Sequence, residues 1–157
     1  MSFVTLEEAK FQLRVDGTEE DTLIASKIAA AEIDAQRHMN RNVYADAVAL
    51  AAAIAAVPAQ MADAVVTYDA ATDTACTLEG DQRAIAMIGA NEAYSNAKIE
   101  SIRTYRGIVI NEAIKSAILL IIGDLYADRE NSKAGSTSKV STASVDLLNK
   151  FRVSPGV

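Results

Sequence analysis

The chain is poor in the residues that metal sites and disulfides need. Among 157 residues it has one cysteine, Cys76, one histidine, His38, and no tryptophan. A single cysteine excludes a disulfide framework within the chain, and nothing indicates an oxidising compartment. Zinc sites use several Cys or His ligands, so this pair predicts no metal site. We read Cys76 as a packing residue and His38 as a solvated or core-edge side chain, and we expect no cofactor.

Basic charge is also scarce. The chain has 15 Lys and Arg against 21 Asp and Glu, which gives a net charge of −6. A dedicated nucleic-acid binder needs clustered basic side chains to displace counterions from phosphates. Here the arginines are scattered through the sequence, which opposes a standing affinity for DNA. They include Arg14, Arg37, Arg41, Arg103, Arg106 and Arg152.

The apolar run of the most hydrophobic predicted helix is short, and the sequence shows no catalytic motif. The apolar run at 117–123 is far shorter than the roughly 20 residues that span a bilayer, and the N-terminus lacks a basic region followed by an apolar stretch. We therefore expect a cytoplasmic protein that does not contact a membrane. The sequence has no P-loop, no dinucleotide fingerprint and no nucleophile elbow. An enzyme is the last of the functions that we consider, because no nucleophile, base and ligands converge on one stretch.

What the chain has is alanine and aliphatic residues in helical periods. Half of the residues are hydrophobic while aromatic residues make up only 5%, and alanine is a strong helix former. We predict an all-α fold in a single domain over 1–157: a small helical bundle with a long central apolar helix and an alanine-rich helical insertion. Thr5 and Glu8 form a capping box before a short first helix that ends near Arg14. A second amphipathic helix follows the acidic residues 19–21 and ends near Asn40.

The segment 45–106 differs in texture, because it is alanine-rich and weakly patterned. We expect one helix over 45–56, a second that begins near Pro58 and is closed by Gly80, and a third over 81–101. The residues 65–68 also fit a strand. Small alanine side chains allow helices to approach closely, so this segment is expected to form a helical hairpin or to lie along a partner.

The last third of the chain contains the most hydrophobic predicted helix. An extended stretch at 107–110 leads to Asn111, a candidate N-cap, and the central helix then runs to about Glu130. Its stripe consists of Ile114, Ile118, Ile121 and Leu125. Residues 131–143 are rich in Ser, Lys and Gly and predict a mobile loop. Ser144 is the expected cap of a last short helix, which turns Val145, Leu148 and Phe151 towards the core.

Three blocks of this sequence resemble the head–tail connector proteins of tailed phages, which form the adaptor ring below the portal. They are VTLEEAKFQLRVDGTEEDTLIASKIAAAEIDAQRHMNR at the start, GIVINEAIKSAILLIIGDLYADRE around the central helix, and VDLLNKFRV near the end. Between the first two blocks, 43–106 departs from the shorter family members and looks like an alanine-rich helical insertion. The resemblance implies a non-enzymatic structural protein of the virion neck, assembled in the host cytoplasm. It implies a homo-oligomeric ring that docks on the portal, offers a platform for a neck or tail completion protein, and lets DNA through without specific binding.

Four residues are candidate interface residues on this reading: Tyr126, Arg129, Glu130 and Arg152. We expect the first three to fix the end of the central helix or to contact a neighbouring subunit. The acidic side chains at 124, 128 and 130 also have the chemistry of a general acid or base, although ion pairing at the helix end is the simpler interpretation. The alternative function is a small cytoplasmic helical regulator that binds a protein partner through an apolar groove.

Overall fold

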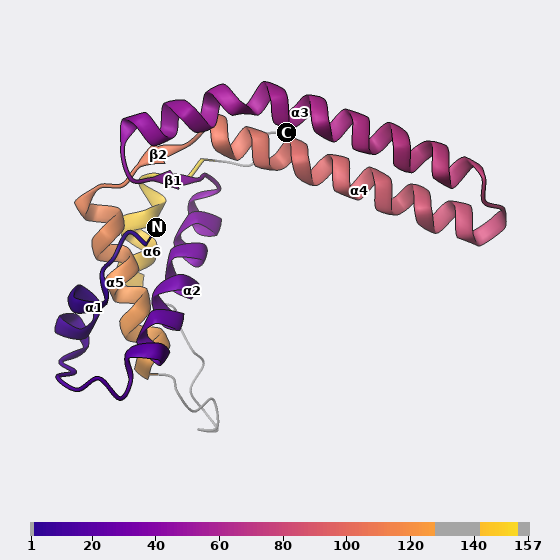
Figure 1. The fold of residues 1–157 in the computed structure, drawn as a ribbon. Coiled ribbons are helices and arrows are strands. Elements are labelled where there is room, and N and C mark those ends of the chain that lie inside the picture. Colours follow the sequence, from indigo (N-terminus) through magenta and orange to yellow (C-terminus); the bar gives the residue numbers. More distant parts are fainter. Residues whose placement is uncertain (1, 128–141, 154–157) are drawn as a thin grey trace.

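The computed structural model describes residues 2–127 and 142–153, and it shows a helical bundle from which a long helical hairpin projects (Figure 1). The bundle contains α1 (Leu6–Leu13), α2 (Asp21–Met39), α5 (Glu112–Ala127) and α6 (Thr142–Asn149). The hairpin, which we call the arm, consists of α3 (Ala47–Cys76) and α4 (Gly80–Tyr105). The prediction of an all-α bundle with a central apolar helix is confirmed.

The core of the bundle lies where α1, α2 and α6 pack around α5. Its fully buried members include Ile24 and Met39 of α2, Ile114 and Ile118 of α5, and Leu148 of α6. The buried positions of α2 recur at three- and four-residue spacing, as the sequence predicts, so its apolar stripe meets that of α5. They are Ile24, Ile28, Ala31, Ala35 and Met39.

Local signals in the sequence also set the ends of the bundle helices. The capping box is present: the Glu8 amide donates to Thr5 Oγ1 at 3.2 Å, and the Thr5 amide donates to Glu8 Oε2 at 2.9 Å. Asn40 ends α2 in the left-handed conformation, with φ 54°. Asn111 caps α5, since its Oδ1 accepts from the Ile114 amide at 3.0 Å.

The arm corrects the predicted helix boundaries. Residues 45–56 and the residues after Pro58 do not form two helices, because α3 continues through Pro58. A proline inside a helix removes one hydrogen bond, but alanine-rich sequence on both sides keeps a high helix propensity and Val57 is buried. Gly80 does not close a helix but begins α4, with φ 55°. The strand that residues 65–68 allow is not formed.

Two short strands join the arm to the bundle. β1 (Val43–Tyr44) precedes α3, β2 (Ile108–Val109) follows α4, and the two pair in parallel, with Val43 opposite Ile108 and Tyr44 opposite Val109. The sequence predicted the extended stretch at β2 but not its partner β1. Of the predicted loop at 131–143, residues 131–141 lie outside the described residues. The last two residues, 142 and 143, belong to α6, which therefore begins before the expected cap Ser144.

Candidate assembly surfaces

The end of α5 is held by Tyr126. Its hydroxyl donates to the Glu20 carboxylate, which belongs to the residue that precedes α2, so the contact ties the end of α5 to the start of α2. This contact lies within one chain, and the role of Tyr126 at a subunit interface stays a prediction. Arg129 and Glu130, which were expected to act with it, lie outside the described residues.

Arg152 lies at the other end of the bundle. It follows α6 beside the C-terminal end of α2, where the Val153 amide donates to the Met39 carbonyl at 3.0 Å. The 19 residues of α2 separate this end from the Tyr126 contact, a distance of roughly 28 Å at the helical rise of about 1.5 Å per residue. The Arg152 side chain is exposed. Tyr126 and Arg152 thus do not form one patch.

The base of the arm is organised by Arg41. Its Nε donates to the Arg106 carbonyl at 2.5 Å, its second guanidinium nitrogen to the Phe151 carbonyl at 3.3 Å, and its third to the Gly107 carbonyl at 3.4 Å. Burial lowers the pKa of Arg41 from its ordinary value, and the three carbonyl oxygens compensate for the lost hydration of the cation. One side chain thus connects the end of α2, the end of the arm and the segment after α6.

Asn42 and Gly107 complete this junction. Asn42 Nδ2 donates to Glu100 Oε1 at 2.6 Å, while the Ile108 amide donates to the Asn42 carbonyl at 2.9 Å. A Cβ atom on Gly107 would lie 2.7 Å from both Leu50 Cδ1 and Tyr44 Cε2. The glycine therefore permits a close approach of the strand to the root of α3. Sequence reasoning gave Gly107 no role, because a lone glycine does not show what lies next to it.

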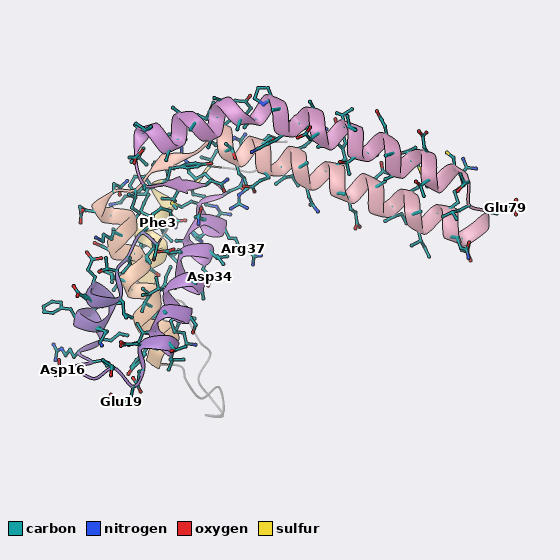
Figure 2. The ribbon with its side chains drawn as sticks, in the orientation of Figure 1. Phe3, Asp16, Glu19, Asp34, Arg37 and Glu79 are labelled. Atoms are coloured by element: carbon teal, nitrogen blue, oxygen red, sulfur yellow. The ribbon has the colours of Figure 1, made fainter. Side chains whose placement is uncertain are left out.

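The two helices of the arm pack through one face each. The rings of Tyr68 and Tyr94 lie 5.1 Å apart between their centroids, and the Tyr68 hydroxyl donates to Asn91 Oδ1 at 3.1 Å. Lys98 Nζ lies 5.6 Å from the centroid of the Tyr94 ring. The predicted helical hairpin is confirmed. Its tip, which Glu79 marks in Figure 2, lies far from the bundle.

The outer faces of the arm remain in contact with solvent. Large aliphatic side chains project from both helices, and their exposed fractions range from 40% to 78%. They are Val48, Val65 and Val66 on α3, and Ile85, Ile88, Ile99 and Ile102 on α4. Exposed aliphatic side chains grouped on one helical element favour a contact surface.

Phe11 on α1 is a second exposed apolar site, with 88% of its surface accessible. It lies outside the predicted apolar stripe of that helix, and this was the available signal: an aromatic residue on the polar side of an amphipathic helix. The pattern of the sequence identifies the core-facing stripe of α1, and Phe11 does not belong to that pattern.

By length and composition, α3 is also able to cross a membrane, and it is the one such helix among residues 2–127 and 142–153. The core helix of a soluble protein can have the same length and composition. α4 packs along α3 and carries charges on its exposed surface, among them Glu92 and Lys98. Transfer of the hairpin into lipid would bury these charges at considerable cost.

A groove of about 480 Å³ lies between α2, α5 and α6. Ile121, Leu125 and Leu148 provide its apolar lining, and charged side chains of both signs, including Lys27 and Asp34, line it as well. Figure 2 shows Asp34 and Arg37 on the same helix, α2. His38, which also lines the groove, contacts Asn149 Oδ1 through Nε2 at 2.9 Å.

The described residues contain no group of three or more His, Cys, Asp or Glu side chains that could hold a metal ion. Cys76 is exposed at the tip of the arm, and Arg83 lies 3.7 Å from its sulfur. It is therefore not the packing residue that the sequence predicted.

Comparison with known protein families identifies a match to part of the chain. Residues 3–103 match the family described as phage gp6-like head-tail connector protein. The chain belongs to this phage gp6-like head–tail connector family. The match covers α1, α2, β1, α3 and most of α4. No curated protein and no solved structure is significantly similar to the chain.

The family membership confirms the resemblance seen in the sequence. The first of the three blocks lies within the matched residues, whereas the blocks around α5 and α6 lie beyond them. As a head–tail connector, the protein is a structural component of a phage virion that is assembled in the host. Its contact surfaces, rather than a catalytic centre, are the candidate functional site.

Proposed function

We propose that this connector assembles into a closed homo-oligomeric ring in the neck of a tailed phage and has no catalytic activity. The family match over residues 3–103 carries the proposal. The arm supports it, because a helical hairpin with exposed aliphatic side chains on both outer faces has surface to bury against neighbouring copies. Repetition of one such contact about an axis gives a ring.

The ring docks on the portal protein and receives a neck or tail completion protein on its other side. DNA passes through the central channel without specific binding. The net charge of −6 supports this last part, since a channel that must release DNA should not hold its phosphates. A strongly basic channel in an electron microscopy reconstruction of the ring would contradict it.

Tyr126, Arg129, Glu130 and Arg152 are proposed to contribute to contacts in the ring. Because Tyr126 and Arg152 lie at opposite ends of the bundle, they would act in different contacts. Charge reversal at Arg129 should impair assembly while the circular dichroism of the monomer stays unchanged. The 43–106 segment is proposed to be an addition to a smaller bundle, and its arm to be a second assembly element.

The decisive experiment measures the mass of the purified protein by light scattering, alone and mixed with purified portal, and images both samples by negative-stain electron microscopy. We expect rings in at least one of the two samples. A monomer at high concentration that also fails to bind the portal would refute the proposal.

A further inference from the structure

The α4 surface of the arm carries an exposed isoleucine stripe. Its positions follow one another at alternating spacings of three and four residues, on the side of α4 that faces away from α3. They are Ile85, Ile88, Glu92, Ser95, Ile99 and Ile102, and the four isoleucines expose between 46% and 69% of their surface. We call this set the isoleucine stripe. From Ile85 to Ile102 it extends roughly 26 Å along the helix.

The α3 surface carries the counterpart on the other side of the arm, displaced towards the bundle, because Tyr68 of α3 packs level with Tyr94 of α4. Its positions follow the same alternating spacing and are all exposed: Val48, Ala52, Ala55, Ala59, Ala62 and Val66. We call this set the alanine stripe. It extends roughly 27 Å, which closely matches the isoleucine stripe. The next two positions in the same spacing are Asp69 and Asp73, so the apolar stripe ends there.

We propose that the isoleucine stripe of one subunit packs against the alanine stripe of the next subunit. This inference rests on the proposed ring and names the surfaces that join its members. The spacing is that of a coiled-coil seam, in which side chains of one helix insert between those of the other. Large side chains on one surface and small ones on the other allow two helices to approach closely and still fill the space between them.

The arrangement of the two stripes selects a second copy of this chain as the occupant. Each subunit presents both stripes on opposite sides, which is what a heterologous, repeating contact requires. Two alanine stripes together would bury little apolar surface. Two isoleucine stripes related by a twofold axis would bring the Glu92 carboxylates towards each other within an apolar contact, which is unfavourable.

The contact between the two stripes is too small to hold two subunits together on its own. A surface of roughly 26 Å by about 10 Å, the width of a helix, is small beside the ~800 Å² per partner of a stable interface. The arm contact therefore acts together with contacts between the bundles, and it contributes most when the ring closes and every subunit makes both contacts.

Crosslinking tests the pairing directly. In a Cys76→Ser background, Ala62→Cys and Ser95→Cys place one thiol on each stripe. With a bifunctional maleimide, the double variant should give a ladder of covalent oligomers, whereas each single variant should remain monomeric on a denaturing gel. Dimers from Ser95→Cys alone, or a double variant that yields no ladder under conditions where rings are seen, would overturn the proposal.

Charge substitutions test it in an independent way. Ile99→Glu and Ala55→Glu introduce a carboxylate into each stripe, and both sites are exposed, so the monomer should keep its helical circular dichroism. Gln82→Glu and Gln60→Glu add the same charge away from the stripes as matched controls. We expect at least tenfold fewer rings, counted by electron microscopy under the conditions in which the wild type assembles, for the first pair and no change for the controls.

The outcomes separate this inference from the proposed function. If the wild type forms rings and both stripe variants form them equally well, the arm contact is wrong and the ring stands. If the wild type forms no ring alone or on the portal, the proposed function itself fails. Binding of the arm to phosphatidylcholine vesicles in place of self-association would overturn the contact in favour of a lipid surface.

Discussion

Replacement of Arg41 by methionine should loosen the arm from the bundle. The side chain donates to three backbone carbonyls that belong to the arm base and to the segment after α6. A hydrogen bond from a charged donor contributes about 1.5–3 kcal/mol. Only the bond to the Arg106 carbonyl, at 2.5 Å, is short; those at 3.3 and 3.4 Å are near the outer limit of good geometry.

We therefore count one strong bond and expect Arg41→Met to lower the free energy of unfolding by about 2–3 kcal/mol. Methionine keeps most of the apolar packing, so the change reports mainly on the hydrogen bonds. Arg41→Lys keeps the charge but lacks the planar fork that reaches three carbonyls. Its free energy of unfolding should therefore lie between those of Arg41→Met and the wild type. The assay is urea denaturation followed by circular dichroism, with the midpoint and slope fitted together.

Arg37→Met is the matched control. Arg37 lies in the last turn of the same helix, is exposed, and loses only a favourable interaction with the helix dipole of about 0.3–1 kcal/mol. Hydrogen exchange adds a local readout: amides at the roots of α3 and α4 should exchange faster in Arg41→Met than in Arg37→Met. Equal unfolding free energies for the two variants would refute the role assigned to Arg41.

Three further predictions concern single positions. Gly107→Ala should destabilise the protein by about 1–3 kcal/mol in urea denaturation, because the added Cβ has no room. Gly123→Ala, where nothing lies within 4 Å of the added Cβ, should stabilise the protein by up to about 1 kcal/mol. Equal effects of the two substitutions would contradict this. Pro58→Ala should raise the melting temperature of the monomer, since it restores a helical hydrogen-bond donor, and an unchanged or lower value would argue against the continuous helix. The hydrogen bond from Lys115 lowers the pKa of Glu8 below its ordinary 4.5, so the stabilisation is present above that pH and is lost as the pH falls through the folded-state pKa. Glu8→Gln should therefore reduce the loss of stability on acidification, measured by urea midpoints between about pH 5 and pH 3. The same pH dependence in the variant as in the wild type would exclude the effect.

The bundle could be predicted from the sequence because its signals are local or periodic. Each signal is recognisable from residues that are close together in the sequence. Examples are the capping box at Thr5, the N-cap Asn111 and the isoleucines of α5. The family resemblance came from these same segments. In the arm, by contrast, alanine occupies both buried and exposed helix faces, so the sequence shows no clear apolar stripe. The predicted helix boundaries were therefore wrong around Pro58 and Gly80.

The junction and the assembly surfaces were harder to predict for another reason. Arg41 and Gly107 act through residues far away in the sequence, and a two-residue strand such as β1 has no period to detect. Tyr126 and Arg152 were identified by residue type, which does not show that they lie at opposite ends of α2. The exposed isoleucines of α4 became informative only when the structure showed which side α3 covers.

The parallel pairing of β1 with β2 makes the chain leave the bundle and return to it at neighbouring points. The two crossings are fixed by hydrogen bonds such as that from the Ile110 amide to the Tyr44 carbonyl, at 2.8 Å. Because α3 and α4 form an antiparallel hairpin, both helices can gain or lose whole turns at the tip without moving the two ends. The reach of the arm is therefore open to variation by insertion or deletion while the bundle keeps its sequence.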